Sequence, residues 1–160
     1  MTTPVVQRLF TTPVIEAVLA SPEPSAIAEA ARSLAARYTT DVTQPARPRF
    51  TWEVGIREIV LAPGEIQPLT TAPGAFWVAM CRIDASGGAG EVALEDPRAA
   101  TTRAGLAGLD VSCDPGIERL QVPPAGLVMF QAFLRHGLVN STTAPQRWAV
   151  VDLGVRRTGP

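Results

Sequence analysis

From Thr51 onward the sequence breaks into short apolar, β-branched runs that are separated by glycine and proline turn signals. The runs that read as strands are FTWEVGIREIVLAP, GAFWVAMCRID, GEVALEDP, ERLQVPPAGLVMFQAFL and RWAVVDLGV. Many short strands between regular turn signals are typical of a sandwich, a barrel or a jelly roll. The pattern therefore predicts a mainly β chain with a cupin-like jelly roll, in which residues 1–160 form a single domain.

The segment before these runs has a different composition and periodicity. SPEPSAIAEAARSLAARY is rich in alanine, and we expect it to form the one long helix of the chain, with Ser21 or Ser25 as its N-cap. An apolar stripe at helical spacing runs along it: Ile27, Ala30, Ala31 and Leu34. The opening QRLFTTPVIEAVL reads as an edge strand, where the missing N–H of Pro13 is tolerated.

Composition excludes several classes of protein. The net charge is −1 and no long basic patch is present, so we expect no nucleic-acid partner. No apolar run reaches about 18 residues, which argues against a membrane span. The first residues do not resemble a secretory signal, and we therefore expect a cytoplasmic protein. Cys81 and Cys113 do not have the spacing of a metal motif.

Four segments in order carry a resemblance to a known family: RLFTTPV, GGAGEVALEDPRAA, VPPAGLVMFQAFLRHGLVNST and APQRWAVVDLGV. Together they resemble the 2-oxoglutarate/Fe(II)-dependent oxygenases. That resemblance implies a double-stranded β-helix, which is the jelly roll that the strand pattern predicts separately. It also implies that His136 matches the later metal-binding histidine of the family, and that Arg147 matches the arginine that pairs with the 2-oxoglutarate carboxylate.

The first metal-binding motif of the family, H-x-D or H-x-H, should fall in IQPLTTAPG, near residues 69–71. That stretch contains neither histidine nor carboxylate, and His136 is the only histidine in the chain. A facial triad needs two imidazoles and one carboxylate. We therefore expect no metal and no cofactor, with Fe(II) and 2-oxoglutarate only if the resemblance holds despite the missing ligands.

His136 and Arg147 are the candidate catalytic residues. His136 follows FQAFLR and precedes glycine, which places it at a strand end or turn. It is either a general acid/base or a histidine held by a backbone carbonyl. Arg147 begins an alternating strand, and either grips a carboxylate or enolate inside the pocket or lies on the surface.

Aromatic and sulfur-containing side chains in the strand segments are candidates for an apolar pocket. The residues predicted to bind substrate are Trp77, Met80, Phe130 and Trp148. The alternative for most of them is a place in the core. Because the two interpretations differ in whether the space is open, the tertiary structure is needed to separate them.

Three functions are consistent with these residues. The first is a metal-independent enzyme of bacterial specialised metabolism that cyclises, isomerises or eliminates an apolar small molecule. The second is a non-catalytic pseudo-oxygenase that binds a ligand or serves as a scaffold. Here the cavity that holds the substrate in the oxygenases should be filled by side chains, and a separate apolar surface patch should be present. The third is a true oxygenase with an irregular metal site. A homodimer is an open possibility for each.

Overall fold

The computed structural model describes residues 4–9, 12–40, 50–84, 88–97 and 116–158. These residues form one helix and nine strands. The elements are β1 (Val5–Leu9), β2 (Thr12–Val18), α1 (Pro24–Tyr38), β3 (Phe50–Leu61), β4 (Trp77–Arg82), β5 (Gly90–Glu95), β6 (Ile117–Val122), β7 (Gly126–Gln131), β8 (Arg135–Val139) and β9 (Gln146–Arg157). No helix among them is long and apolar enough to cross a membrane.

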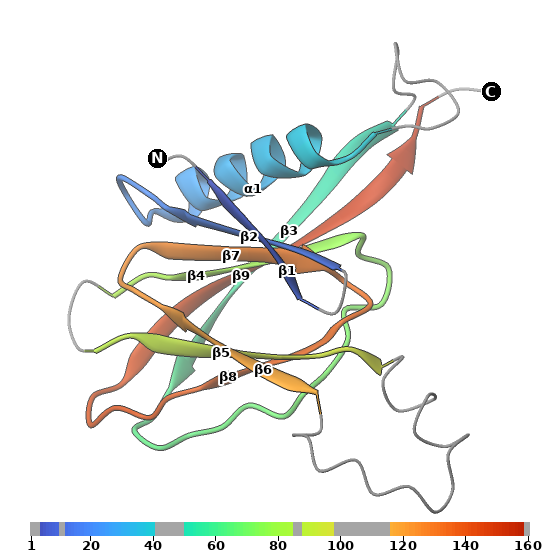
Figure 1. Ribbon diagram of the computed structural model, residues 1–160. Helices are drawn as coiled ribbons and strands as arrows, with labels where there is room; N and C mark the ends of the chain where they lie inside the picture. Colours follow the sequence, from blue (N-terminus) through green and yellow to red (C-terminus); the bar gives the residue numbers. More distant parts are fainter. Residues whose placement is uncertain (1–3, 10–11, 41–49, 85–87, 98–115, 159–160) are drawn as a thin grey trace, which may run out of the picture.

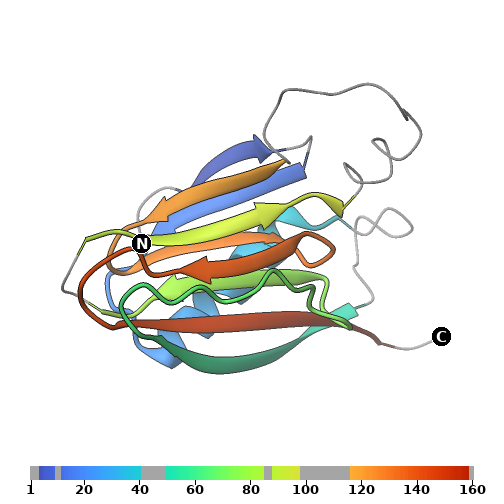
Figure 2. The same cartoon turned by 90° about the horizontal axis from the view of Figure 1, so that it is seen from below.

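The strands form two antiparallel sheets that face each other. The larger sheet has the order β1-β2-β7-β4-β9-β3, and the smaller sheet has the order β6-β5-β8. Figure 1 shows α1 lying across the outer face of the larger sheet, and Figure 2 shows the smaller sheet stacked against its inner face. Non-consecutive strands are neighbours in both sheets. The predicted mainly β jelly roll with one long helix is therefore confirmed.

Alternation along the strands divides the core into two layers. One layer lies between α1 and the outer face of the larger sheet and includes Ile27 and Leu34 of the helix. The other layer lies between the two sheets and includes Val78, Val92 and Leu138. Because successive strand residues point to opposite faces, neighbouring positions on one strand contribute to different layers.

The helix forms for the predicted reason but begins differently. Ile27, Ala31 and Leu34 are buried against the sheet, as the apolar stripe predicts. The N-cap is Glu23, without a side-chain hydrogen bond, and Pro24 opens the first turn. The prediction that Ser21 or Ser25 caps the helix is therefore wrong. Proline is suited to this position because its fixed φ is helical and no partner for its missing N–H is required there.

Two strand predictions need correction. The opening segment contains two strands, and Pro13 lies in β2, which is flanked by β1 and β7 and is therefore not an edge strand. Pro13 is the second residue of β2, where the ladder begins and a missing donor is tolerated. The strand β8 was not predicted, since Gly137 reads as a turn residue, and His136 lies within that strand.

Candidate functional site

The strand β9 sorts the candidate residues between the two faces of the larger sheet. Trp148 and Val150 lie in the layer between the sheets, whereas Ala149 and Val151 lie in the layer under α1. This is the alternation that the sequence predicts. Arg147 therefore lies on the outer face, where its guanidinium donates a hydrogen bond to the Glu58 carboxylate at 2.9 Å and is half-exposed.

His136 lies on β8 and faces the space between the sheets. Its side chain is 3% exposed, and its ring centroid lies 5.2 Å from that of Phe130. The Nδ1 atom lies 2.9 Å from the carbonyl oxygen of Leu134. Because a carbonyl only accepts, Nδ1 carries the proton in the neutral ring and Nε2 carries the lone pair. Both sequence interpretations of His136 thus remain open, since its backbone bond leaves Nε2 available.

Electrostatics favour the neutral form of this imidazole. Burial lowers the pKa of His136, and the Leu134 carbonyl and the Asp152 carboxylate partly oppose that effect. Arg57 lowers the same pKa further. A neutral imidazole at pH 7 is a competent proton acceptor.

Asp152 and Arg57 form an ion pair on the inner face of the larger sheet, between β9 and β3. The Oδ2 atom of Asp152 accepts the hydrogen bond from Arg57. The Oδ1 atom is buried and has no hydrogen-bond partner among the described residues. Asp152 also lines an open groove of about 340 Å³, together with Gly55 and Gly74. Sequence reasoning missed this pair, because the two residues are 95 positions apart.

The segment that should carry the first metal ligands lies directly beside His136. Thr70 and His136 form a bridge in which each backbone N–H donates to the other's carbonyl, at 2.9 and 2.7 Å. A Cβ atom on Gly137 would lie 2.6 Å from the carbonyl oxygen of Gln67, so only glycine permits this close approach. The resemblance thus identified the correct neighbouring segment, although that segment has no metal-binding side chain.

The residues at this position do not fit Fe(II). The Leu69, Thr70 and Thr71 side chains provide neither imidazole nor carboxylate beside His136, whereas a facial triad requires both. Among the described residues, no group of three or more His, Cys, Asp or Glu side chains could hold a metal ion. Arg147 lies on the outer face of the larger sheet, whereas His136 belongs to the smaller sheet and faces the inner side of the larger one, so the two side chains do not form one site.

Three of the four predicted pocket residues fill the space between the sheets. Met80, Phe130 and Trp148 are each less than 2% exposed and belong to the same buried cluster. A Cβ atom on Gly90 would lie 2.2 Å from the Trp148 ring, which shows how closely β5 approaches that ring. The structure therefore places these three side chains in the core.

Trp77 does not join the other three residues. It lies in the layer under α1, where its indole N–H donates to Thr39 Oγ1 at 2.8 Å. The expectation that Trp77 lies beside Met80 in one pocket is wrong, because alternation along β4 places the two side chains on opposite faces.

Burial raises the pKa of the Cys81 thiol to about 12, so this cysteine is not an activated nucleophile. Cys113 lies outside the described residues.

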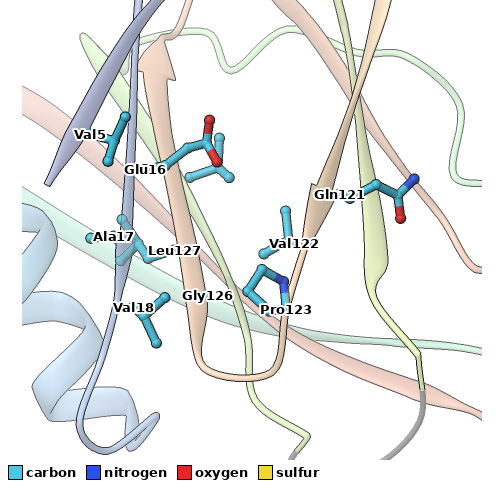
Figure 3. Close-up of a pocket in the computed structure, with 10 residues that line it drawn as sticks. Val5, Glu16, Ala17, Val18, Gln121, Val122, Pro123, Gly126 and Leu127 are labelled. Atoms are coloured by element: carbon cyan, nitrogen blue, oxygen red, sulfur yellow. The ribbon is translucent and has the colours of Figure 1, made fainter. Parts of the chain in front are cut away.

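A separate pocket of about 200 Å³ opens at one side of the sandwich. Figure 3 shows that it lies between β1 and β2 on one side and β6 on the other. Its wall is mostly apolar, and Val5, Val18, Val122 and Pro123 line it together with the Glu16 carboxylate. We call it the lateral pocket. The sequence does not reveal it, because its wall combines residues 5–18 with residues 121–128, which are far apart in the sequence.

Comparisons with known proteins point to one fold. No protein-family model matches the chain, and no curated protein matches it. A prolyl-4-hydroxylase from Pseudomonas putida superposes with a TM-score of 0.51, at 10% identity over 96% of this chain and 78% of that one. A 2OG-Fe(II) oxygenase family oxidoreductase from Burkholderia pseudomallei has a TM-score of 0.49 at 8% identity, covering 95% of this chain and 73% of its own.

The structure of EvdO2 from Micromonospora carbonacea var. aurantiaca, complexed with 2-oxoglutarate, has a TM-score of 0.43 at 15% identity. That match covers 68% of this chain and 55% of EvdO2, so the chain spans little more than half the length of that protein. The likeness to the prolyl-4-hydroxylase is one of fold, and at that level it confirms the resemblance in the sequence. The chain has the double-stranded β-helix fold of the 2-oxoglutarate/Fe(II) oxygenase structures.

Proposed function

We propose that this chain is a non-catalytic binding protein with an oxygenase-like fold, and that it holds a small apolar molecule in the lateral pocket. The observation that carries the proposal is the filling of the space between the sheets by Met80, Phe130 and Trp148, each less than 2% exposed. A reaction between the sheets requires room for a substrate beside His136. Side chains of the protein itself take up that room.

The donor chemistry beside His136 supports the same proposal. A 2-oxoglutarate oxygenase holds its metal with three side chains. The segment around Thr70, which should supply the other ligands, pairs with His136 through its backbone and has no imidazole or carboxylate side chain. Arg147, the candidate for binding a carboxylate of the ligand, is hydrogen-bonded to Glu58 on the outer face of the larger sheet. No step of the proposed function therefore involves a metal or 2-oxoglutarate.

The lateral pocket supplies what the space around His136 lacks. It is open to solvent, and its wall is mainly apolar, with four valines. Concave apolar walls with few polar groups are typical of small-molecule sites. The Glu16 carboxylate is the charged group in that wall, which favours a ligand that is apolar and carries no negative charge.

The test has two parts on the purified chain. Stability of the metal-stripped protein is measured with Mn(II) and 2-oxoglutarate, separately and together. A ligand at a hundredfold excess over its Kd adds about 2.7 kcal/mol, and we expect no such joint rise. A rise that needs both compounds would contradict the proposal and indicate an oxygenase.

Binding is measured with the neutral fluorescent probe N-phenyl-1-naphthylamine. We expect saturable binding that is lost in Val18→Trp, because the larger side chain fills the lateral pocket. The matched control is Val6→Trp, which makes the same change at an exposed β1 residue outside the pocket wall. Equal binding by the two variants, or no binding by the native chain, would contradict the assignment of the pocket.

A second candidate function is a metal-independent acid–base enzyme, and His136 is the observation that favours it. Its Nε2 atom bears the lone pair, its pKa is lowered, and the Arg57–Asp152 pair lies close enough to influence it electrostatically. Such an imidazole suits proton abstraction during an isomerisation or elimination. This function requires that a substrate reach Nε2.

Because the chain has one histidine, the carbethoxyhistidine that forms with diethyl pyrocarbonate reports on His136 alone. The binding-protein proposal predicts that the folded chain reacts much more slowly than the urea-unfolded chain. Rapid modification of the folded chain would favour the enzyme, since it shows that a small electrophile reaches the ring. His136→Gln is the blank for other reactive groups.

A further inference from the structure

The strand β3 is an unusually long and regular sheet edge. It pairs with β9 from Phe50 to Leu61 in one unbroken register, without proline and without a bulge. Among the described residues, no other strand pairs with it. Residues 55–58 in its middle are all exposed. Figure 2 shows this strand at the outer limit of the larger sheet. Proteins usually protect such an edge with charged side chains, a bulge, a proline or a covering segment, or pair it with another chain. The strand β3 has charged side chains, which can also pair with those of a second copy.

The hydrogen bonds of β9 determine which backbone groups of β3 are unpaired. The N–H of Ile83, just after β4, donates to the Arg147 carbonyl at 2.9 Å, so the backbone groups of Arg147 point toward β4. In an antiparallel sheet this direction alternates along the strand. The backbone N–H and C=O groups of even-numbered β9 residues therefore point toward β3. The register pairs these residues with odd-numbered residues of β3. The N–H and C=O groups of even-numbered β3 residues, such as Val54 and Ile56, point away from the sheet.

The sequence of β3 is complementary to itself in one antiparallel register. If Gly55 lies on a two-fold axis, Glu53 of each copy is opposite Arg57 of the other, and Val54 is opposite Ile56. No like charges are opposed in this register. Within the chain Glu53 lies 3.7 Å from Arg156, and Arg57 is paired with Asp152. The Glu53 and Arg57 side chains are still 63% and 49% exposed, so a second chain can also reach them.

The backbone geometry agrees with the same register. Val54 and Ile56 would form hydrogen-bonded pairs, since their backbone groups point outward. Glu53 and Arg57 would form non-hydrogen-bonded pairs, in which Cα atoms come closer and opposite charges interact well. A single axis thus satisfies the backbone, the apolar contacts and the charges together.

We infer that two copies of this chain form a dimer by antiparallel pairing of their β3 strands about Gly55, which joins the two larger sheets into one continuous sheet. Charge complementarity between Glu53 and Arg57 selects the register. The inference does not depend on the proposed function, because β3 does not contribute to the lateral pocket.

The test is the mass of the native chain and of Ile56→Pro, measured by sedimentation equilibrium over a range of concentrations. Proline removes an N–H that points away from β9, so the fold keeps its ladder while the dimer loses a hydrogen bond at each of two positions. We expect a dimer for the native chain, and a dissociation constant at least about tenfold higher for the variant. Unchanged circular dichroism and Tm verify that Ile56→Pro is folded.

Charge variants test the register itself. Glu53→Arg opposes like charges twice across the axis and should weaken the dimer, whereas Glu53→Gln, which removes the pair without opposing like charges, should weaken it less. A monomeric native chain at high concentration would overturn the inference. A dimer that withstands both Ile56→Pro and Glu53→Arg would overturn it as well, since that dimer would use another surface.

Discussion

Two parts of the space between the sheets differ in how they are filled. Around His136 the space is closed, because Met80, Phe130 and Trp148 occupy it and β5 approaches the Trp148 ring. At the side where β2 faces β6 the space is open, and the lateral pocket lies there. The same two sheets bound both parts. The difference shows that two facing sheets enclose a cavity only where the side chains between them are small or where one sheet extends beyond the other.

Sheet width explains the open part. Among the described residues, the larger sheet has six strands and the smaller has three, so β1 and β2 extend to a side at which β6 is the last described strand of the smaller sheet. Large side chains explain the closed part. A protein interior packs to high density, so a tryptophan in this layer excludes a substrate of similar size.

The largest expected effect comes from opening the closed part. Trp148→Ala should lower the free energy of unfolding by about 3–5 kcal/mol, because a fully buried indole is lost and a cavity remains. Urea unfolding followed by circular dichroism measures the change. If the cavity persists, added indole should raise the Tm of the variant but not that of the native chain.

The matched control for this variant is Val5→Ala, in the wall of the open pocket, where the side chain is 58% exposed. It should cost less than about 1 kcal/mol. Similar losses for Trp148→Ala and Val5→Ala would contradict the distinction between a closed part and an open part.

A smaller effect is expected where residues 66–70 approach β8. Gly137→Ala places a Cβ 2.6 Å from the Gln67 carbonyl, so the segment must move away from the strand. We expect a loss of about 1–3 kcal/mol in the same unfolding experiment. Gly88→Ala is the control, because the nearest atom to its Cβ is the Thr142 methyl carbon at 3.6 Å, an ordinary van der Waals contact. If alanine is tolerated equally at both positions, the closed part is looser than the described contacts imply.

The smallest effect is a dependence of stability on pH. The pKa of His136 is lowered in the folded state, chiefly by burial, from its usual value of 6.5. The unfolded chain then binds more protons between that value and the lower folded pKa. The contribution to stability is complete above about pH 6.5 and is lost as the pH falls toward the folded pKa.

The measurement is Tm between pH 8 and pH 5. The native chain should lose a few degrees more than His136→Gln over this range, because only the native chain has a histidine to titrate. Arg147→Ala should retain the native pH dependence, since Arg147 lies on the other face. If His136→Gln and the native chain have parallel curves, the ring is accessible to water and the closed part is open.

Much of the fold was predictable from local patterns. The helix, the strands from β3 onward except β8, and the alternation of β9 follow from periodicity and turn signals, which act over a few residues. The resemblance also directed attention to the stretch around Thr70 as the neighbour of His136, and the structure pairs the two. The strand β8 was missed because the feature that makes Gly137 necessary is the distant Gln67 carbonyl, which no local pattern contains.

The candidate site was predictable only in part. The sequence by itself determined that the chain has one histidine and no other imidazole to build a facial triad, and that Arg147 and Trp148 face opposite sides of a strand. Tertiary structure decided which of those sides is the interior, that Trp77 lies under the helix, and that Arg57 and Asp152 form an ion pair whose charges act on His136. The physical reason is that periodicity sets the relative orientation of neighbours on one strand, whereas the packing of sheet on sheet and helix on sheet sets which face is closed and where space remains.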